Sequence, residues 1–88
     1  MKYILELTER YEKQFAKLDR SSQIIISKWL VKNIDGTSDP RSKGKALKGE
    51  KLGPWRYRVG NYRVIVQIQD EKLIVLALEV GHRRDIYL

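Results

Sequence analysis

The sequence contains no cysteine and only one histidine, His82, among its 88 residues. The absence of thiols excludes disulfide bonds and zinc sites built on thiolates, and a single imidazole excludes a histidine-rich metal site. We therefore expect no cofactor and no structural metal. Any enzymatic chemistry has to come from the other polar side chains.

Long apolar runs are also missing. No stretch approaches the roughly 20 consecutive apolar residues that a membrane-spanning helix needs. The first six residues reach an acidic side chain too early for a signal peptide, so we expect a cytoplasmic protein with no membrane contact. With 42% hydrophobic and 33% charged residues, the chain is predicted to form a single folded domain, residues 1–88.

Acidic residues are scarce in the middle of the chain, so the net charge of +7 is unevenly placed. Residues 1–40 hold seven basic and six acidic residues, and residues 64–88 hold three and four. Residues 41–63 hold eight basic residues and one acidic residue. Such a localised excess is typical of a surface that binds a polyanion or an acidic partner. The composition favours nucleic acid or an acidic protein segment over a merely solvated patch.

Hydrophobic periodicity predicts an α+β fold with the order strand, helix, helix, strand, strand, strand. We expect the two helices to pack on one face of a mostly antiparallel four-stranded sheet, with the first strand beside the last long one. The expected elements, in chain order, are a strand over 2–7, helices over 9–19 and 22–35, a hairpin over 54–66 and a strand over 73–78.

Both helices carry start signals. Thr8 is a suitable N-cap for the first helix, and Ser21 or Ser22 for the second, because a hydroxyl oxygen accepts from free backbone N–H groups. Gly36 suits the end of the second helix. The side chains expected to reach the core from the second helix and the loop after it are Ile25, Ile26, Trp29, Leu30, Ile34, Leu47 and Leu52.

Gly60-Asn61 is a two-residue hairpin connection with glycine first, as a type II′ turn prefers. Such a turn fixes the register, with Val59 opposite Tyr62 and Arg58 opposite Arg63. One face of the hairpin is then apolar, and like charges directly opposite one another on the second face cost about 0.2–1 kcal/mol per pair. This arrangement indicates a site for an anion, formed by the guanidiniums of Arg56, Arg58 and Arg63.

Two flanking segments extend the basic character of the hairpin. Residues 36–53 contain four glycines and are predicted to be a loop. Its lysines are candidate contacts to nucleic acid, or else a solvated surface: Lys43, Lys45, Lys48 and Lys51. Gly81 is expected to break or kink the last strand and so to bring four side chains to its end, those of His82, Arg83, Arg84 and Tyr87.

Two stretches together carry a family resemblance: Lys45 to Ile65 (KALKGEKLGPWRYRVGNYRVI) and Val80 to Tyr87 (VGHRRDIY). They resemble the RelE family of toxins from toxin–antitoxin modules, within the RelE/ParE superfamily. The resemblance covers essentially the whole chain and implies a RelE-like fold. It also implies a metal-independent, ribosome-dependent endoribonuclease that cleaves mRNA in the A site, leaving 2′,3′-cyclic phosphate and 5′-hydroxyl ends. The implied partner is a RelB-like antitoxin, through which alone the protein would contact operator DNA.

The resemblance assigns roles to three residues. Arg63 matches the family arginine that stabilises the phosphate, a role that suits the planar guanidinium fork. Arg83 matches an arginine assigned to proton donation or charge stabilisation. Tyr87 matches a tyrosine that stacks on a splayed base, an interaction typically worth about 1–3 kcal/mol.

Arg56 and Arg58 depart from the family pattern, because they stand where well-studied members carry lysines, one of them the proposed general base. An arginine stays protonated and is a poor base. Either electrostatic stabilisation carries most of the rate, or His82 transfers a proton. The departure also keeps two other functions open: ParE-like inhibition of DNA gyrase, and a basic module that only binds RNA or represses its own operon with a partner.

Overall fold

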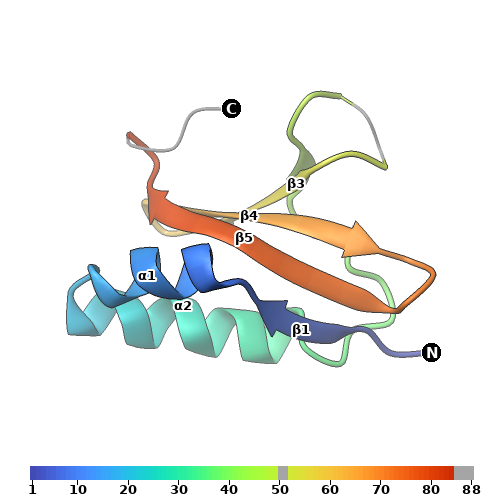
Figure 1. The fold of residues 1–88 in the computed structure, drawn as a ribbon, viewed down its shortest axis with the longest axis horizontal. Coiled ribbons are helices and arrows are strands. Elements are labelled where there is room, and N and C mark those ends of the chain that lie inside the picture. Colours follow the sequence, from blue (N-terminus) through green and yellow to red (C-terminus); the bar gives the residue numbers. More distant parts are fainter. Residues whose placement is uncertain (50–51, 85–88) are drawn as a thin grey trace.

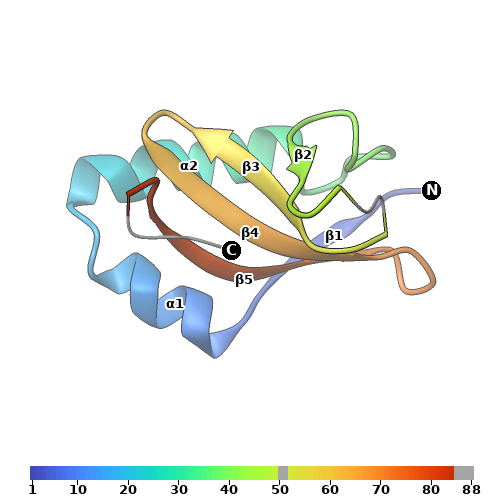
Figure 2. The same cartoon turned by 90° about the horizontal axis from the view of Figure 1, so that it is seen from above.

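The computed structural model describes residues 1–49 and 52–84, which form two layers (Figure 1). Two helices cover one face of a five-stranded sheet, and Figure 2 shows the strands crossing over the long helix α2. The elements are β1 (Ile4–Leu7), α1 (Glu9–Ala16), α2 (Arg20–Asn33), β2 (Lys45–Ala46), β3 (Trp55–Val59), β4 (Tyr62–Gln69) and β5 (Ile74–His82). In the part of the chain described, neither helix has the length and apolarity needed to cross a membrane.

The strand order across the sheet is β1-β5-β4-β3-β2. β1 runs parallel to β5, with Ile4 opposite Ile74, and every other neighbouring pair is antiparallel. The prediction that the first strand lies beside the last long strand is therefore confirmed. β5 lies between β1 and β4, which explains why its sequence is apolar on both faces.

The sheet has five strands where four were predicted. The additional strand is β2, only two residues long, which pairs with the start of β3 through Lys45 opposite Arg56 and Ala46 opposite Trp55. Two residues are too few to show an alternating pattern, and they lie within a segment that the glycines mark as a loop. The pairing with β3 is what makes them a strand.

The two helices begin at different kinds of cap. Thr8 caps α1 as predicted, with its hydroxyl oxygen accepting from the Tyr11 N–H at 3.1 Å. The prediction of a serine cap for α2 is wrong, because α2 begins earlier and its cap is Asp19. The Asp19 carboxylate accepts from the Ser22 N–H at 3.1 Å and from the hydroxyls of Ser21 and Ser22. An anionic cap at the positive end of the helix dipole stabilises the helix more than a hydroxyl does.

The apolar face of the hairpin forms the core with α2. The observed register is the predicted one, and Gly60 alone in the turn has a positive φ, as a type II′ turn requires. Tyr57 is fully buried and its ring lies 5.5 Å from that of Trp29 on α2. Two predicted core residues are instead exposed: Ile25, at 58%, faces away from the sheet, and Leu52 is 77% exposed.

β5 does not break at Gly81 as predicted, but continues to His82. Its irregularity lies earlier, where Val66 is opposite Ala77 and Ile65 is opposite Glu79, so that Leu78 has no partner. This β-bulge shifts the alternation of side chains by one residue. Beyond the bulge, the even-numbered residues face the core.

Candidate functional site

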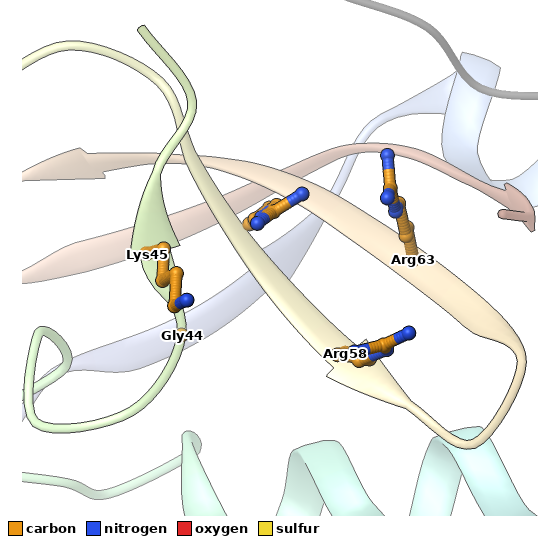
Figure 3. A pocket seen from close by; sticks show the side chains of 5 residues that line it. Gly44, Lys45, Arg58 and Arg63 are labelled. Atoms are coloured by element: carbon orange, nitrogen blue, oxygen red, sulfur yellow. The ribbon is translucent and has the colours of Figure 1, made fainter. Parts of the chain in front are cut away.

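Three neighbouring strands present cationic side chains on the face of the sheet that the helices leave uncovered. Arg58 on β3 is directly opposite Arg63 on β4, and Lys45 on β2 is directly opposite Arg56 on β3. Directly opposed residues share a face, so β2 adds a fourth cation to the three predicted there. They surround an open hollow of about 210 Å³ (Figure 3), lined by Gly44, Lys45, Arg56, Arg58 and Arg63.

The charges of this hollow are not balanced by neighbouring acids. Within residues 1–49 and 52–84, no carboxylate forms an ion pair with any of its three arginines. Glu79, which stands opposite Ile65 on the same face, is instead held by Arg10 of α1 at 3.2 Å. The face therefore retains the repulsion between like charges, and an anion bound in the hollow would relieve it.

A second basic hollow adjoins the first at the end of β5. Arg63 belongs to both hollows, and it stands opposite Gly81, which has no side chain to cover it. The chain after β5 is held against the hairpin turn, because the Arg83 N–H donates to the Asn61 carbonyl at 2.8 Å. The structure thus brings Arg83 next to Arg63, in a hollow lined by Asn61, Arg63, His82, Arg83 and Arg84.

His82 points to the other side of the sheet from the arginines. It is directly opposite Tyr62, and the two rings meet edge to face with centroids 5.6 Å apart. Tyr62 is on the helix side, where its hydroxyl lies within hydrogen-bond distance, 3.0 Å, of the Ser22 hydroxyl of α2. His82 Nδ1 accepts from the Arg84 N–H at 3.3 Å. His82 nevertheless lines the second hollow together with Arg63 and Arg83, and it does not line the first.

The lysines of the long loop are separated by the fold. Of the three loop lysines that the structure describes, Lys45 lines the hollow, whereas Lys43 and Lys48 do not, and all three are exposed. Lys51 and Tyr87 lie outside the described residues, so their predicted contacts to RNA remain predictions.

The segment before β2 is held by hydrogen bonds from β3 and by the close approach of the Gly44 backbone to that of β3. Trp55 Nε1 donates to the Lys43 carbonyl at 2.7 Å, and the buried Tyr57 hydroxyl donates to the Pro40 carbonyl at 2.6 Å. Burial raises the pKa of Tyr57, which keeps this hydroxyl a donor. Gly44 has φ +79° and lies so close to the Arg56 carbonyl that a Cβ would collide with it. The hollow is therefore built on a rigid edge.

A further clamp ties this segment to the turn between β4 and β5. The Arg41 guanidinium binds the Asp70 carboxylate through two nitrogens, at 2.9 and 3.0 Å, and the Tyr3 hydroxyl donates to the same carboxylate at 2.6 Å. The Arg41 guanidinium, followed by the Tyr3 hydroxyl, lowers the pKa of Asp70. A bidentate pair of this kind fixes direction as well as distance.

Sequence reasoning missed the membership of Gly44 and Lys45 in the arginine hollow. It also left Asn61 and Arg84 out of the candidate site, although both line the second hollow. A glycine immediately before a lysine in a basic loop was the available signal, because glycine marks positions where two backbone segments meet closely. The partner of that close approach, β3, is not visible in the local sequence.

The chemistry available on this face is the binding of phosphate. Guanidinium groups grip phosphate oxygens through two parallel hydrogen bonds, and several of them can stabilise the extra charge of a pentavalent phosphorane. Among the described residues, no three histidine, aspartate or glutamate side chains are grouped so that they could hold a metal ion. The cations of the two hollows are thus the groups that a bound anion would meet.

Comparisons with known proteins agree on one family. The family described as ParE toxin of the type II toxin–antitoxin system parDE matches residues 5–87. Toxin RelG of Mycobacterium tuberculosis is 42% identical over 53 residues, which are 60% of this chain and 61% of that protein. The mRNA interferase toxin RelE of Escherichia coli K12 is 31% identical over 84 residues, covering 94% of this chain and 85% of that protein.

The fold comparison agrees with the sequence comparison. The crystal structure of the RelBE2 toxin–antitoxin complex from Mycobacterium tuberculosis contains a chain that superposes with a TM-score of 0.81 and 27% identity. The superposition covers 97% of this chain and 95% of that one, including the helix pair and the sheet. The chain therefore belongs to the RelE family of toxins from type II toxin–antitoxin modules, within the RelE/ParE superfamily.

Proposed function

We propose that this protein is a ribosome-dependent endoribonuclease that cleaves mRNA in the ribosomal A site and thereby inhibits translation. The observation that carries the proposal is the hollow itself: four cations on one face of the sheet, without a neutralising carboxylate among the described residues. A single-stranded RNA backbone supplies the missing negative charge. The RelE relative of Escherichia coli is named an mRNA interferase, which supports the same activity.

The proposed reaction is transfer of the phosphate from the 5′-oxygen to the 2′-oxygen of the RNA. It leaves a 2′,3′-cyclic phosphate and a 5′-hydroxyl, and no metal takes part. Arg63 binds the phosphate oxygens in the centre of the face, with Arg56 and Arg58 as additional clamps on the β3 side. Arg83, on the other side of Arg63, stabilises charge on the departing 5′-oxygen or supplies its proton. Tyr87, by family resemblance, stacks on a base.

The proposed partners are the ribosome with its mRNA, and a cognate RelB-like antitoxin that neutralises the toxin. The complex from Mycobacterium tuberculosis that this chain resembles pairs a toxin with an antitoxin. An acidic antitoxin segment would satisfy the charge of the arginine face in the resting state. Operator DNA would be reached through the antitoxin alone. These partners require the cytoplasm as the place of action.

The decisive experiment is primer extension on mRNA in a reconstituted translation system. Wild type is expected to cut at A-site codons, and Arg63→Ala or Arg83→Ala to lower the cleavage rate by about 100- to 1,000-fold through loss of charge stabilisation. Arg20→Ala, an exposed arginine at the start of α2 on the helix side, is the matched control and keeps the wild-type rate. Absence of cuts with wild type, or cuts unchanged in both site variants, contradicts the proposal.

Inhibition of DNA gyrase is the second candidate function. Two observations favour it: the matching family description is that of ParE toxins, and arginines occupy both positions 56 and 58 where a lysine base is expected. The test is a gyrase supercoiling assay with excess toxin. Unchanged supercoiling removes this candidate, whereas inhibition without any mRNA cleavage replaces the nuclease proposal by it.

A further inference from the structure

Among the described residues that line the hollow on the sheet, one side chain can accept a proton. Of the five residues that line it, three are arginines, which keep their protons at any relevant pH, and one is glycine. The remaining residue is Lys45, whose amine can lose a proton and act as a base. We propose that Lys45 is the general base that removes the proton from the attacking 2′-hydroxyl, an inference that rests on the nuclease function proposed above.

The fold holds the backbone of Lys45 in place on both sides. Before it, the Lys43 carbonyl accepts from Trp55 Nε1 at 2.7 Å, and Gly44 is pressed against the backbone of β3. After it, the Leu47 N–H donates to the Pro54 carbonyl at 2.9 Å. A group that transfers protons has to be held at a fixed place relative to the substrate, and these contacts fix its strand.

The direction of the side chain fits the role. Lys45 is directly opposite Arg56, so both stand on the same face. Figure 3 shows the side chains of Lys45, Arg58 and Arg63 on three neighbouring strands, with that of Lys45 beside Gly44, and all of these residues line the one hollow. A phosphate gripped by the arginines would therefore lie beside the amine of Lys45.

Other candidate bases are excluded by position within the described residues. His82 lines the second hollow and not the first, and its ring packs edge to face against that of Tyr62. Glu79 is engaged by Arg10 and does not line the hollow. The charged groups that face Lys45 from the packed strands are Arg56 and Arg58 of β3 and Arg63 of β4, and its own segment adds the exposed Lys43 and Lys48.

The proposed step balances without any oxidant, reductant or metal. The neutral Nζ of Lys45 takes the 2′-hydroxyl proton while the 2′-oxygen forms a bond to phosphorus. The bond between phosphorus and the 5′-oxygen then breaks, and the 5′-oxygen takes a proton from water. The lysine ammonium returns its proton to solvent, so the enzyme is unchanged after one turnover.

The first test separates proton transfer from charge. Lys45→Arg keeps the positive charge and removes the base, and Lys72→Arg is the same change at an exposed lysine in the turn between β4 and β5. Cleavage is measured in single turnover, with excess toxin over 70S ribosomes programmed with end-labelled mRNA. We expect Lys45→Arg to lower the maximal rate about a hundredfold or more, with half-saturating toxin concentration unchanged. Lys72→Arg is expected to match wild type.

The second test restores the amine chemically. Because the protein has no cysteine, the thiol of a Lys45→Cys variant can be alkylated alone. Treatment with 2-bromoethylamine places an amine at nearly the length of lysine, whereas iodoacetamide gives a neutral amide as the comparison. We expect the aminoethylated protein to cleave at least tenfold faster than the amidated one, and its rate to rise with pH as that of wild type does. The rising limb is absent in Lys45→Arg.

The outcomes are distinguishable. If wild type leaves mRNA uncut, the nuclease function fails and this inference fails with it. If wild type cuts and Lys45→Arg cuts within threefold of its rate, only the role of Lys45 is overturned. Equal cleavage rates for the aminoethylated and amidated proteins also overturn the role of Lys45. The two proteins differ in the amine, so equal rates would mean that the amine itself does not speed the reaction. Circular dichroism and antitoxin binding verify that each variant is folded.

Discussion

Arg58 of β3 stands directly opposite Arg63 of β4, so two guanidiniums meet on one face of a sheet without an acidic partner among the described residues. This pair sits at the centre of the basic face, between the Lys45 side and the Arg83 side. Such an opposition costs the free protein stability and is relieved by an anion. Stability and anion binding are therefore expected to change in opposite directions when the pair is broken.

Replacing Arg58 by threonine tests this opposition. Arg58→Thr keeps a residue suited to a strand and removes one of the two charges, so the free energy of unfolding should rise by about 0.2–1 kcal/mol at low salt. The gain should shrink at high salt, because Arg58 is exposed and screening weakens the repulsion. Urea denaturation at two salt concentrations measures it.

The same variant should bind single-stranded RNA more weakly. Loss of one phosphate contact lowers the slope of log affinity against log salt by about 0.7. Lys72→Thr serves as the control, because Lys72 is exposed in the turn between β4 and β5 and does not line the hollow. Lower stability together with tighter RNA binding in Arg58→Thr would contradict the prediction.

Alanine substitutions at two glycines with similar φ angles distinguish the cost of backbone strain from the cost of a steric collision. Gly44 has φ +79° and Gly49 has φ +75°, but only at Gly44 would a Cβ collide with the chain of β3. Gly49→Ala should cost about 1–2 kcal/mol from the left-handed conformation alone. Gly44→Ala should cost about 1–3 kcal/mol more, because it pushes β2 away from β3.

The comparison of Gly44→Ala with Gly49→Ala also tests whether RNA cleavage depends on the position of β2. Since Lys45 follows Gly44, displacement of β2 should lower RNA cleavage in Gly44→Ala while Gly49→Ala retains it at a temperature where both are folded. Thermal melts give the stability difference. Equal melting temperatures for the two variants would show that the close approach does not matter.

Acid unfolding should depend on the cap of α2. Hydrogen bonds from the hydroxyls of Ser22 and Ser21 lower the pKa of Asp19 to about 2, from an ordinary value of 3.8. Because the folded-state pKa is depressed, the stabilisation is fully present above about pH 4 and is lost as the pH falls towards 2. Asp19→Ala should lower stability at pH 6 and flatten its dependence on pH in that window.

The measurement is urea denaturation between pH 2 and pH 6, with Glu71→Gln as a control at an exposed acid in the turn between β4 and β5. The control should retain the wild-type slope. An Asp19→Ala variant with the same slope as wild type between pH 2 and pH 4 would rule out the cap as its source.

The buried hydroxyl of Tyr57 should stabilise both the core and the loop that carries β2. Tyr57→Phe removes its hydrogen bond and leaves the Pro40 carbonyl without this donor, at a cost of about 1–3 kcal/mol. Hydrogen exchange should then increase at the amides near Pro40. Tyr62→Phe is the comparison, because its hydroxyl is only partly buried and should cost less.

Local signals in the sequence were sufficient for the hairpin. A two-residue turn beginning with glycine permits one register, and that register was observed residue for residue from Val59 opposite Tyr62 to Trp55 opposite Val66. The cap at Thr8 and the buried positions of α2 at Ile26, Leu30 and Ile34 follow from equally local rules.

Local rules did not predict the features that depend on residues far apart in the sequence. Leu52 stayed exposed because a loop residue reaches the core only where the path of the chain allows it. The cap at Asp19, by contrast, was missed although its partners, Ser21 and Ser22, are neighbours in the sequence. The bulge at Leu78 reversed the alternation in β5 and turned His82 away from the arginines. Without that bulge, period-two counting from Val75 and Ala77 would place His82 on the arginine face.

By itself, then, the sequence determined the charge of the hairpin face, since alternation and turn geometry act over a few neighbouring residues. It also determined the family, through the residues that the relatives share. Only the tertiary structure shows which further residue lies on the arginine face of the hairpin. Lys45 comes to Arg56 because β2 pairs with β3 across eight intervening residues, and long-range backbone pairing of so short a strand has no periodic signature in the sequence.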